Sequence, residues 1–145
     1  MNAAAAERAT DRKILVVEDN SLVAKFYRMA LERVGDFSCL VTENVSEMFE
    51  HIDAGRVLAA LVDVSLPATE WQGRSIDGVE LTRLLKTRAL AATNRPLPVL
   101  LATAHAMAGD RERILAASGA DDYLEKPIYD ATFLVERVRR LCARP

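Results

Sequence analysis

The sequence predicts a doubly wound α/β domain, in which five parallel strands stand in the order 2-1-3-4-5 and helices cover both faces of the sheet. Two observations support this prediction: five short apolar runs recur along the 145 residues, and a segment with helical spacing follows each run. Strict alternation of strand and helix is typical of a parallel sheet with right-handed crossovers. The order 2-1-3-4-5 is a known arrangement for five such strands, and the length corresponds to one domain.

The five strand-like runs differ in how continuously apolar they are. They comprise residues 13–17, 37–41, 57–62, 97–102 and 121–125. The first, third and fourth consist almost entirely of Val, Leu, Ile and Ala, which is typical of central parallel strands buried on both faces. The second and fifth are more mixed in polarity, so we expect them at the edges of the sheet.

Between the runs, apolar side chains recur every three or four residues, as on one face of a helix. The helical patterns cover residues 22–34, 45–52, 79–85, a segment around 114–115, and 133–141. We expect Gly35 to end the first helix and Gly119 to end the fourth, because glycine readily adopts the conformation that follows a helix.

Composition limits the domain organisation and the function class. We expect residues 1–12 to form a flexible N-terminal extension and residues 13–142 to form the folded domain, with an extended segment at about 68–76. The net charge of −2 gives no reason to expect nucleic-acid binding. No run of about 18 apolar residues occurs, so no membrane span is expected. Cys39 and Cys142 lack metal-site spacing and are compatible with a cytoplasmic protein.

Acidic side chains follow the first and third predicted strands. Glu18 and Asp19 come directly after the first strand, and Asp63 comes directly after the third. In such a sheet ligands bind beyond the carboxyl ends of the strands, where the strand order reverses, and that point lies between these two strands. Three converging carboxylates repel one another unless a cation binds them. We therefore expect a Mg²⁺ site here, which Mn²⁺ could also occupy.

The fourth and fifth strands bring two further groups to the same edge, the hydroxyl of Thr103 and the ammonium of Lys126. A hydroxyl, an ammonium and carboxylates around a divalent cation can stabilise a phosphoryl group during its transfer. Each of these residues alone is more often a solvated loop residue or a helix cap. Their occurrence together at one sheet edge indicates a site for phosphoryl transfer.

Five motifs occur in the order ILVVEDN, LVDVSLP, DGVEL, LLATAHA and GADDYLEKPI. Through them the chain resembles the response-regulator receiver domains of two-component signalling, from residue 13 to about residue 142. The resemblance implies that Asp63 accepts a phosphoryl group from a phosphohistidine on a sensor histidine kinase or a histidine phosphotransfer protein. It also implies a Mg²⁺ site made of Glu18, Asp19, Asp63 and the backbone carbonyl of Ser65.

The same resemblance implies roles for three residues after the transfer. Lys126 would pair with the phosphoryl oxygens, Thr103 would move its hydroxyl onto the phosphoryl group, and Tyr123 would switch between exposed and buried positions. The Lys126–Pro127 bond would be cis. Shifting such a switch from 1:99 to 99:1 needs about 5.5 kcal/mol. A few charge-assisted hydrogen bonds, at about 1.5–3 kcal/mol each, can supply this free energy.

By the same resemblance, Ser65 and His105 occupy the positions that set the lifetime of the acyl phosphate. Neither is a carboxylate or an amide that would strongly orient an attacking water. Slow to moderate self-dephosphorylation is therefore expected.

The segment after Pro67 departs from the family pattern. Asp77-Gly78 follows Pro67 several residues later than the corresponding dipeptide in most receivers, and the added stretch carries Trp71 and Arg74. In one interpretation Trp71 and Arg74 form a partner contact beside the site that tunes kinase or phosphatase choice, since Trp and Arg dominate interface energetics. In the other, Trp71 folds onto the third helix as a small satellite core. The sequence leaves both open.

The favoured function is that of a phosphoacceptor domain, not an enzyme, which promotes only its own phosphorylation and dephosphorylation. It would signal by a conformational switch to an unknown downstream protein or pass the phosphoryl group along a relay. A phosphorylation-dependent dimer is left open. One alternative is a receiver domain that belongs to a larger hybrid kinase or multidomain regulator.

Other function classes are less favoured. A Mg²⁺-dependent aspartyl-phosphate phosphohydrolase often needs a second Asp two residues after the nucleophile, where Ser65 stands. A pure interaction module usually lacks one of the acidic residues or the lysine. A flavodoxin-like cofactor binder shares the fold, but Glu18 and Asp19 in the first turn would repel a flavin phosphate.

Overall fold

The computed structural model of the chain describes residues 12–104 and 107–143. Its large sheet consists of β1 (Lys13–Val17), β2 (Ser38–Val41), β3 (Val57–Asp63), β6 (Val99–Thr103) and β7 (Asp122–Glu125). All neighbouring strands of this sheet run parallel, in the order β2-β1-β3-β6-β7. The predicted order 2-1-3-4-5 is confirmed, and the two strands of mixed polarity lie at the edges.

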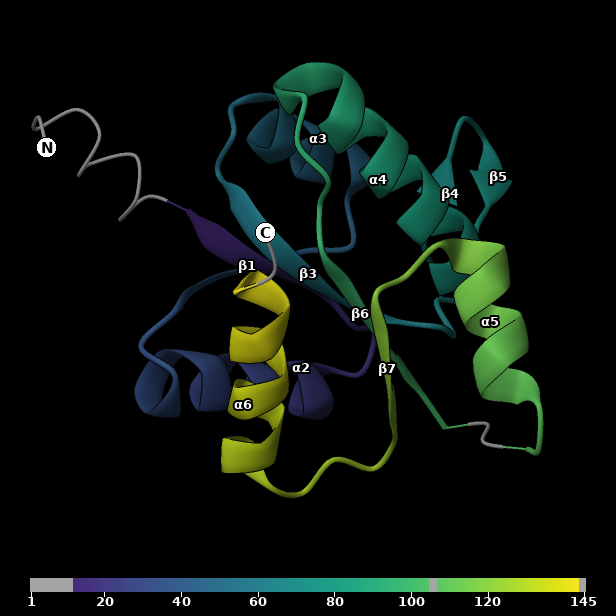
Figure 1. Cartoon of the computed structure of the whole chain (residues 1–145). Helices are drawn as coiled ribbons and strands as arrows, with labels where there is room; N and C mark the ends of the chain where they lie inside the picture. The colour runs from purple at the N-terminus through teal and green to yellow at the C-terminus, as the bar shows by residue number, and fades with distance from the viewer. Residues whose placement is uncertain (1–11, 105–106, 144–145) are drawn as a thin grey trace, which may run out of the picture.

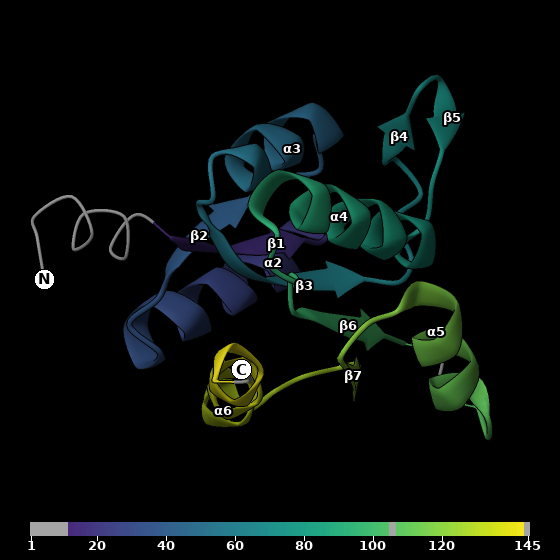
Figure 2. The ribbon, with the colours of Figure 1, turned by 45° about the horizontal axis from the view of Figure 1, so that its top comes forward.

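Helices cover both faces of the sheet (Figures 1 and 2). They are α2 (Ser21–Met29) with its continuation η1 (Ala30–Val34), α3 (Val45–Asp53), α4 (Gly78–Thr93), α5 (Asp110–Ser118) and α6 (Ala131–Cys142). α2, η1 and α6 lie on one face, whereas α3, α4 and α5 lie on the other. Within the part of the chain that the structure describes, none of these helices is long and apolar enough to cross a membrane.

Two apolar clusters separate the helices from the sheet. Leu15 and Val17 face the cluster under α3 and α4, whereas Ile14 and Val16 face the cluster under α2 and α6. All four side chains are buried, because successive residues of a strand point to opposite faces. This burial on both faces explains why the central strands are continuously apolar. It also holds the ends of β1 and β3 in fixed positions.

Four of the helices begin at a capping side chain. The side chains of Asn20, Asn44, Asp77 and Asp130 accept hydrogen bonds from backbone N–H groups in the first turns of α2, α3, α4 and α6. Gly119 ends α5 in the left-handed region, with a φ of 76°. The predicted end of the fourth helix is thus confirmed.

The first helix differs from a uniform α-helix in its last turn. α2 continues into η1, a π-helical turn in which the Gly35 N–H donates to the carbonyl oxygen of Ala30 at 3.1 Å. The predicted stop at Gly35 is confirmed. A Cβ at this position would lie 2.8 Å from the carbonyl oxygen of Leu31, so glycine is required for this close approach.

The segment at 68–76 contains a β-hairpin that the sequence did not predict. Its strands are β4 (Glu70–Trp71) and β5 (Arg74–Ser75), which pair antiparallel. Gln72 and Gly73 join them with φ values of 52° and 75°, and two such residues are typical of a type I′ turn. Strands of two residues are too short to show an alternating pattern, which is why the hairpin escaped prediction.

Candidate functional site

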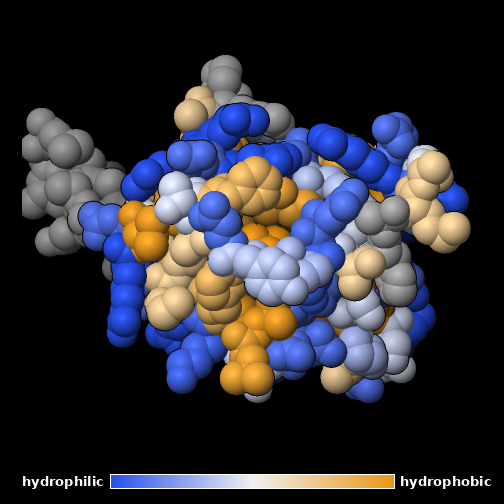
Figure 3. All heavy atoms as spheres, turned by 90° about the horizontal axis from the view of Figure 1, so that it is seen from below, coloured by the Kyte–Doolittle hydropathy of each residue, from blue (hydrophilic) through white to orange (hydrophobic). Residues whose placement is uncertain are grey.

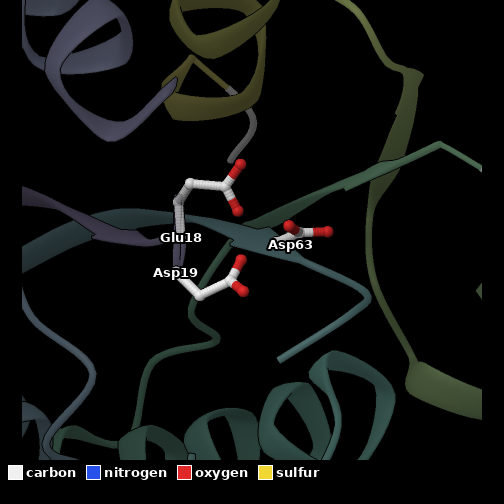
Figure 4. A group of neighbouring side chains, drawn as sticks. All are labelled: Glu18, Asp19 and Asp63. Carbon is white, nitrogen blue, oxygen red and sulfur yellow. The ribbon is translucent and has the colours of Figure 1, made fainter. Parts of the chain in front are cut away.

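Three carboxylates converge where β1 and β3 end side by side. Val17 pairs with Val62 in the sheet, so Glu18 and Asp19 emerge beside Asp63, the last residue of β3. One oxygen atom from each carboxylate lies within 4.8 Å of the others. Figure 4 shows the three side chains pointing toward one another. Glu18 and Asp63 are buried, whereas Asp19 is exposed, which leaves one side of the cluster open to solvent.

Lys126 brings a positive charge to two of these carboxylates. Its Nζ atom lies 2.6 Å from Oε1 of Glu18 and 3.0 Å from Oδ2 of Asp63. The Lys126 N–H donates to the carbonyl oxygen of Thr103 at 2.7 Å, which fixes the residue beyond β7. The Lys126–Pro127 bond is cis, as expected. Burial opposes ionisation of the lysine, but hydrogen bonds to Glu18 and Asp63 raise its pKa above the ordinary value.

Glu18 is a buried acid that interacts with both Asp63 and Lys126. Burial raises its pKa to about 8, helped by the hydrogen bond and charge of Asp63 and opposed by Lys126. Its Oε2 atom is buried and has no hydrogen-bond partner among the described residues. A buried oxygen without a partner is costly, and a divalent cation would satisfy it. The donor set of carboxylates at this sheet edge therefore fits Mg²⁺, a hard cation that prefers oxygen ligands.

Thr103 and Tyr123 are both buried. Thr103 is the last residue of β6, one position beyond the residue that pairs with Asp63. Burial and the charge of Glu125 raise the pKa of the Tyr123 phenol, whereas a hydrogen bond with the Thr103 side chain lowers it. The two residues that the family resemblance links in a switch are thus side-chain partners here, with Tyr123 only 4% exposed.

The backbone after Asp63 is held in place by two hydrogen bonds. The Ser65 N–H donates to Oδ1 of Asp63 at 3.1 Å, and the Gly78 N–H donates to the carbonyl oxygen of Val64 at 2.8 Å. A Cβ at Gly78 would overlap the carbonyl oxygen of Asp63. In the sequence, Gly78 belongs to the DGVEL motif, which by itself gives no sign of this contact. The structure shows that it lets α4 rest directly on the backbone of Asp63.

Trp71 and Arg74 lie on the hairpin and not among the carboxylates. The Trp71 ring is partly buried and meets the Phe49 ring edge-on, with centroids 4.9 Å apart. Trp71 therefore packs as a small satellite core, as one interpretation expected, but its ring contact is with α3, the second predicted helix, and not with the third helix, α4, whose residues line the groove beside it. The partner-contact interpretation stays a prediction. Arg74 pairs with Glu80 at 2.8 Å. His105 lies outside the described residues.

Two hollows adjoin the acidic cluster. One, of about 450 Å³, is lined by Glu18 and Asp19 together with residues of α2 and the end of β2. The other, of about 480 Å³, is lined by Lys126 and otherwise almost entirely by apolar residues. Figure 3 shows hydrophobic side chains gathered near the centre of the face that the β7–α6 connection crosses in Figure 1. Leu22 and Tyr129, on this second hollow, are 77% and 85% exposed.

Residues 14–139 match the family model of the response regulator receiver domain. The chain is 32% identical over 123 residues to the polar-differentiation response regulator DivK of Brucella anthropi, across 85% of this chain and 90% of DivK. It is 33% identical over 136 residues to the transcriptional regulatory protein CseB of Streptomyces coelicolor; this covers 94% of the chain but only 51% of CseB. Among solved structures, the receiver domain of the sensor histidine kinase PA1611 from Pseudomonas aeruginosa, with magnesium coordinated in its active-site cleft, gives a TM-score of 0.69 at 28% identity, over 92% of this chain and 98% of that one.

Proposed function

Because the chain belongs to the response regulator receiver family of two-component signalling, we propose that it is a Mg²⁺-dependent phosphoacceptor in which Asp63 takes the phosphoryl group. Receiver domains take phosphate from histidine kinases and signal to downstream partners. The main support for this proposal is the arrangement at one sheet edge, where Lys126 contacts the carboxylate cluster of Glu18, Asp19 and Asp63.

In this proposal Asp63 is the nucleophile. One of its carboxylate oxygens attacks the phosphorus atom of a phosphohistidine, the P–N bond breaks, and its electron pair stays on the departing imidazole nitrogen. The product is an acyl phosphate on Asp63. Lys126, which already contacts Asp63 at 3.0 Å, is placed to donate to a phosphoryl oxygen, and such charge-assisted hydrogen bonds stabilise the transferring group.

The cation site would comprise the carboxylates of Glu18, Asp19 and Asp63 and the backbone carbonyl of Ser65. The partnerless Oε2 of Glu18 supports this assignment, as does the mutual distance of the three carboxylates. Bound Mg²⁺ would offset the charge of these carboxylates and of the phosphoryl oxygens. Mn²⁺ would serve in the same place, because both ions accept oxygen ligands.

The response to phosphorylation would start at Thr103 and Tyr123. A phosphoryl group brings about −1.5 to −2 charges and three acceptor oxygens, so the Thr103 hydroxyl would exchange its hydrogen bond with Tyr123 for one to the phosphoryl group. Movement of these two side chains would alter the surface of α5, β7 and α6 that a downstream protein reads. Ser65 and His105 would set the lifetime of the acyl phosphate.

The phosphohistidine would come from a sensor histidine kinase or a histidine phosphotransfer protein. Attack on phosphorus requires the reacting atoms to approach to roughly 3–3.5 Å, so the donor must cover the rim of the site. The apolar hollow that includes Leu22, Ile128 and Tyr129 is also lined by Lys126, and exposed apolar surface of this kind marks a protein contact. A donor seated there would bring its imidazole over Asp63.

Intact mass after incubation with acetyl phosphate tests the proposal. The wild-type chain should gain one phosphoryl group in the presence of Mg²⁺ and none after chelation of the metal. Asp63→Asn should gain none, whereas Asp36→Asn, which changes an exposed carboxylate outside the cluster, should gain one as the wild type does. Equal gain in Asp63→Asn and the wild type would refute the assignment of the acceptor.

A further inference from the structure

The hairpin, α3 and α4 together form a groove of about 490 Å³ that phosphoryl transfer at Asp63 does not use. We call it the hairpin groove and define it by Phe49 of α3, Trp71 of β4, and Leu84 and Ala91 of α4. Figure 2 shows the hairpin on the same side of the sheet as α3 and α4. Phe49 is 8% exposed and Leu84 and Trp71 are partly buried, so the groove has an apolar floor.

Contacts among three side chains, Trp71, Phe49 and Arg88, hold the floor of the groove in place. The Trp71 ring meets the Phe49 ring at 72°, with 4.9 Å between centroids. The guanidinium of Arg88 lies 4.8 Å from the centroid of the same Phe49 ring. Asp53 fixes that guanidinium with two hydrogen bonds of 2.7 and 2.5 Å. Edge-on aromatic pairs and cation–π contacts of this kind restrict side-chain motion, so little ordering would be needed on binding.

The rim of the groove carries an excess of positive charge. Arg74, Arg83 and Arg88 line it, and Glu80 is the acidic residue among the lining residues. Arg74 is paired with Glu80 and Arg88 with Asp53, but Arg83 is exposed and forms no ion pair within residues 12–104 and 107–143. A carboxylate of a binding partner could therefore pair with the guanidinium of Arg83. An ammonium group of a partner would find only Glu80 and Asp53, which are already paired with arginines.

We propose that the hairpin groove is the docking site for an acidic amphipathic helix of a partner protein. The apolar face of the helix would lie over Trp71 and Leu84, with a carboxylate on Arg83. Thr87 and Ala91 on the exposed face of α4 have small side chains, so a helix could approach α4 closely there. A helix laid in an apolar groove is a recurrent mode of recognition. A nucleic acid fits less well, because Glu80 and Asp53 lie beside the arginines and the net charge of the chain is −2.

A designed peptide of about 18 residues tests the proposal, with leucines at helical spacing and glutamates at its other faces. Trp71 is the single tryptophan of the chain, so its emission reports directly on the groove, and calorimetry gives an independent affinity. The expected result is saturable binding that is at least about tenfold tighter than that of a matched peptide with lysine in place of glutamate. Equal binding of both peptides, or of neither, would overturn the proposal.

Three variants locate the binding. Arg83→Glu and Ala91→Glu should each weaken binding by about tenfold or more, whereas Arg140→Glu, the same charge change on an exposed residue of α6, should leave it unchanged. Equal loss in Arg83→Glu and Arg140→Glu would show only a net-charge effect. Peptide-free self-association that Ala91→Glu abolishes, or displacement of the peptide by a short DNA duplex, would assign the groove to a different occupant. Asp63→Asn should bind as the wild type does, so the outcome is independent of the proposed phosphoacceptor function.

Discussion

Substitution of Gly78 by alanine tests how closely α4 must rest on the acceptor strand. Gly78 has a φ in the ordinary negative range, and alanine in place of glycine in a helix should stabilise the protein by about 1 kcal/mol. However, the added Cβ would lie 2.7 Å from Cα of Val64 and 2.8 Å from the carbonyl carbon of Asp63, and closer still to the carbonyl oxygen of Asp63. Restoring an ordinary 3.4 Å contact to Val64 alone requires a shift of about 0.7 Å.

These neighbours are backbone atoms, so the shift must displace either α4 or Asp63. Overpacking of this kind costs about 1–3 kcal/mol, and we expect Gly78→Ala to be destabilised by up to about 2 kcal/mol in urea unfolding once the helix-propensity gain of about 1 kcal/mol is subtracted. A misplacement of about 1 Å can reduce a reaction rate by about 100-fold. Loading from acetyl phosphate, followed by intact mass, should therefore slow by at least about tenfold.

Gly55→Ala provides the control for this experiment. Gly55 has a φ of 72°, and a Cβ added to it would have no atom within 4 Å, so alanine there introduces backbone strain of about 1 kcal/mol without a clash. It should lower stability and leave the loading rate unchanged. If Gly78→Ala kept both the stability and the loading rate of the wild type, the inferred contact between α4 and the acceptor backbone would be wrong.

Three further substitutions test contacts described for the site and the sheet. Lys126→Met removes the cation that contacts Asp63 at 3.0 Å; loading from acetyl phosphate should fall by about 100-fold, while circular dichroism stays native. Burial raises the pKa of Asp122, but the hydrogen bonds from Arg137 at 2.8 and 2.5 Å, the backbone N–H of Tyr123 and the charges of Arg137 and Arg111 together keep it below its usual range. This stabilisation is present above the unfolded-state pKa near 3.8 and is lost as pH falls through the lower folded-state value, so Arg137→Met should lower the unfolding free energy by about 2 kcal/mol at pH 7 and by less at pH 3. Trp71→Ala should cost about 1–2 kcal/mol in urea unfolding with loading unchanged; slowed loading would show that the hairpin supports the acceptor.

Most of the fold could be predicted because strands buried on both faces need a continuous apolar sequence. The runs at 13–17, 57–62 and 97–102 carry that signal, and each contains or overlaps an observed strand. Because β1 and β3 are neighbouring parallel strands, the strand order alone places Glu18 beside Asp63, independently of side-chain conformation. The sequence thus predicted which residues meet at the sheet edge, because the edge is defined by strand ends alone.

Properties that depend on distance or on local shape could not be predicted. The raised pKa of Glu18 depends on burial and on its contacts with Asp63 and Lys126, and a sequence gives no distances. The hairpin at 70–75 has strands too short for a periodic pattern. The side on which Trp71 lies depends on a type I′ turn and on where Phe49 is, so composition alone left its two interpretations equal.

The way the hairpin is joined to the domain makes it a separable module. The Gly78 N–H bonds to the carbonyl oxygen of Val64 at 2.8 Å, and the Ile76 N–H bonds to the carbonyl oxygen of Thr69 at 3.0 Å. These two hydrogen bonds close the base of the segment that carries the hairpin, so the two ends of this segment lie close together without straining β3. The turn at Gln72-Gly73 is therefore a natural graft point, where a fluorophore, an epitope or a second binding loop can be installed while the carboxylate cluster keeps its geometry.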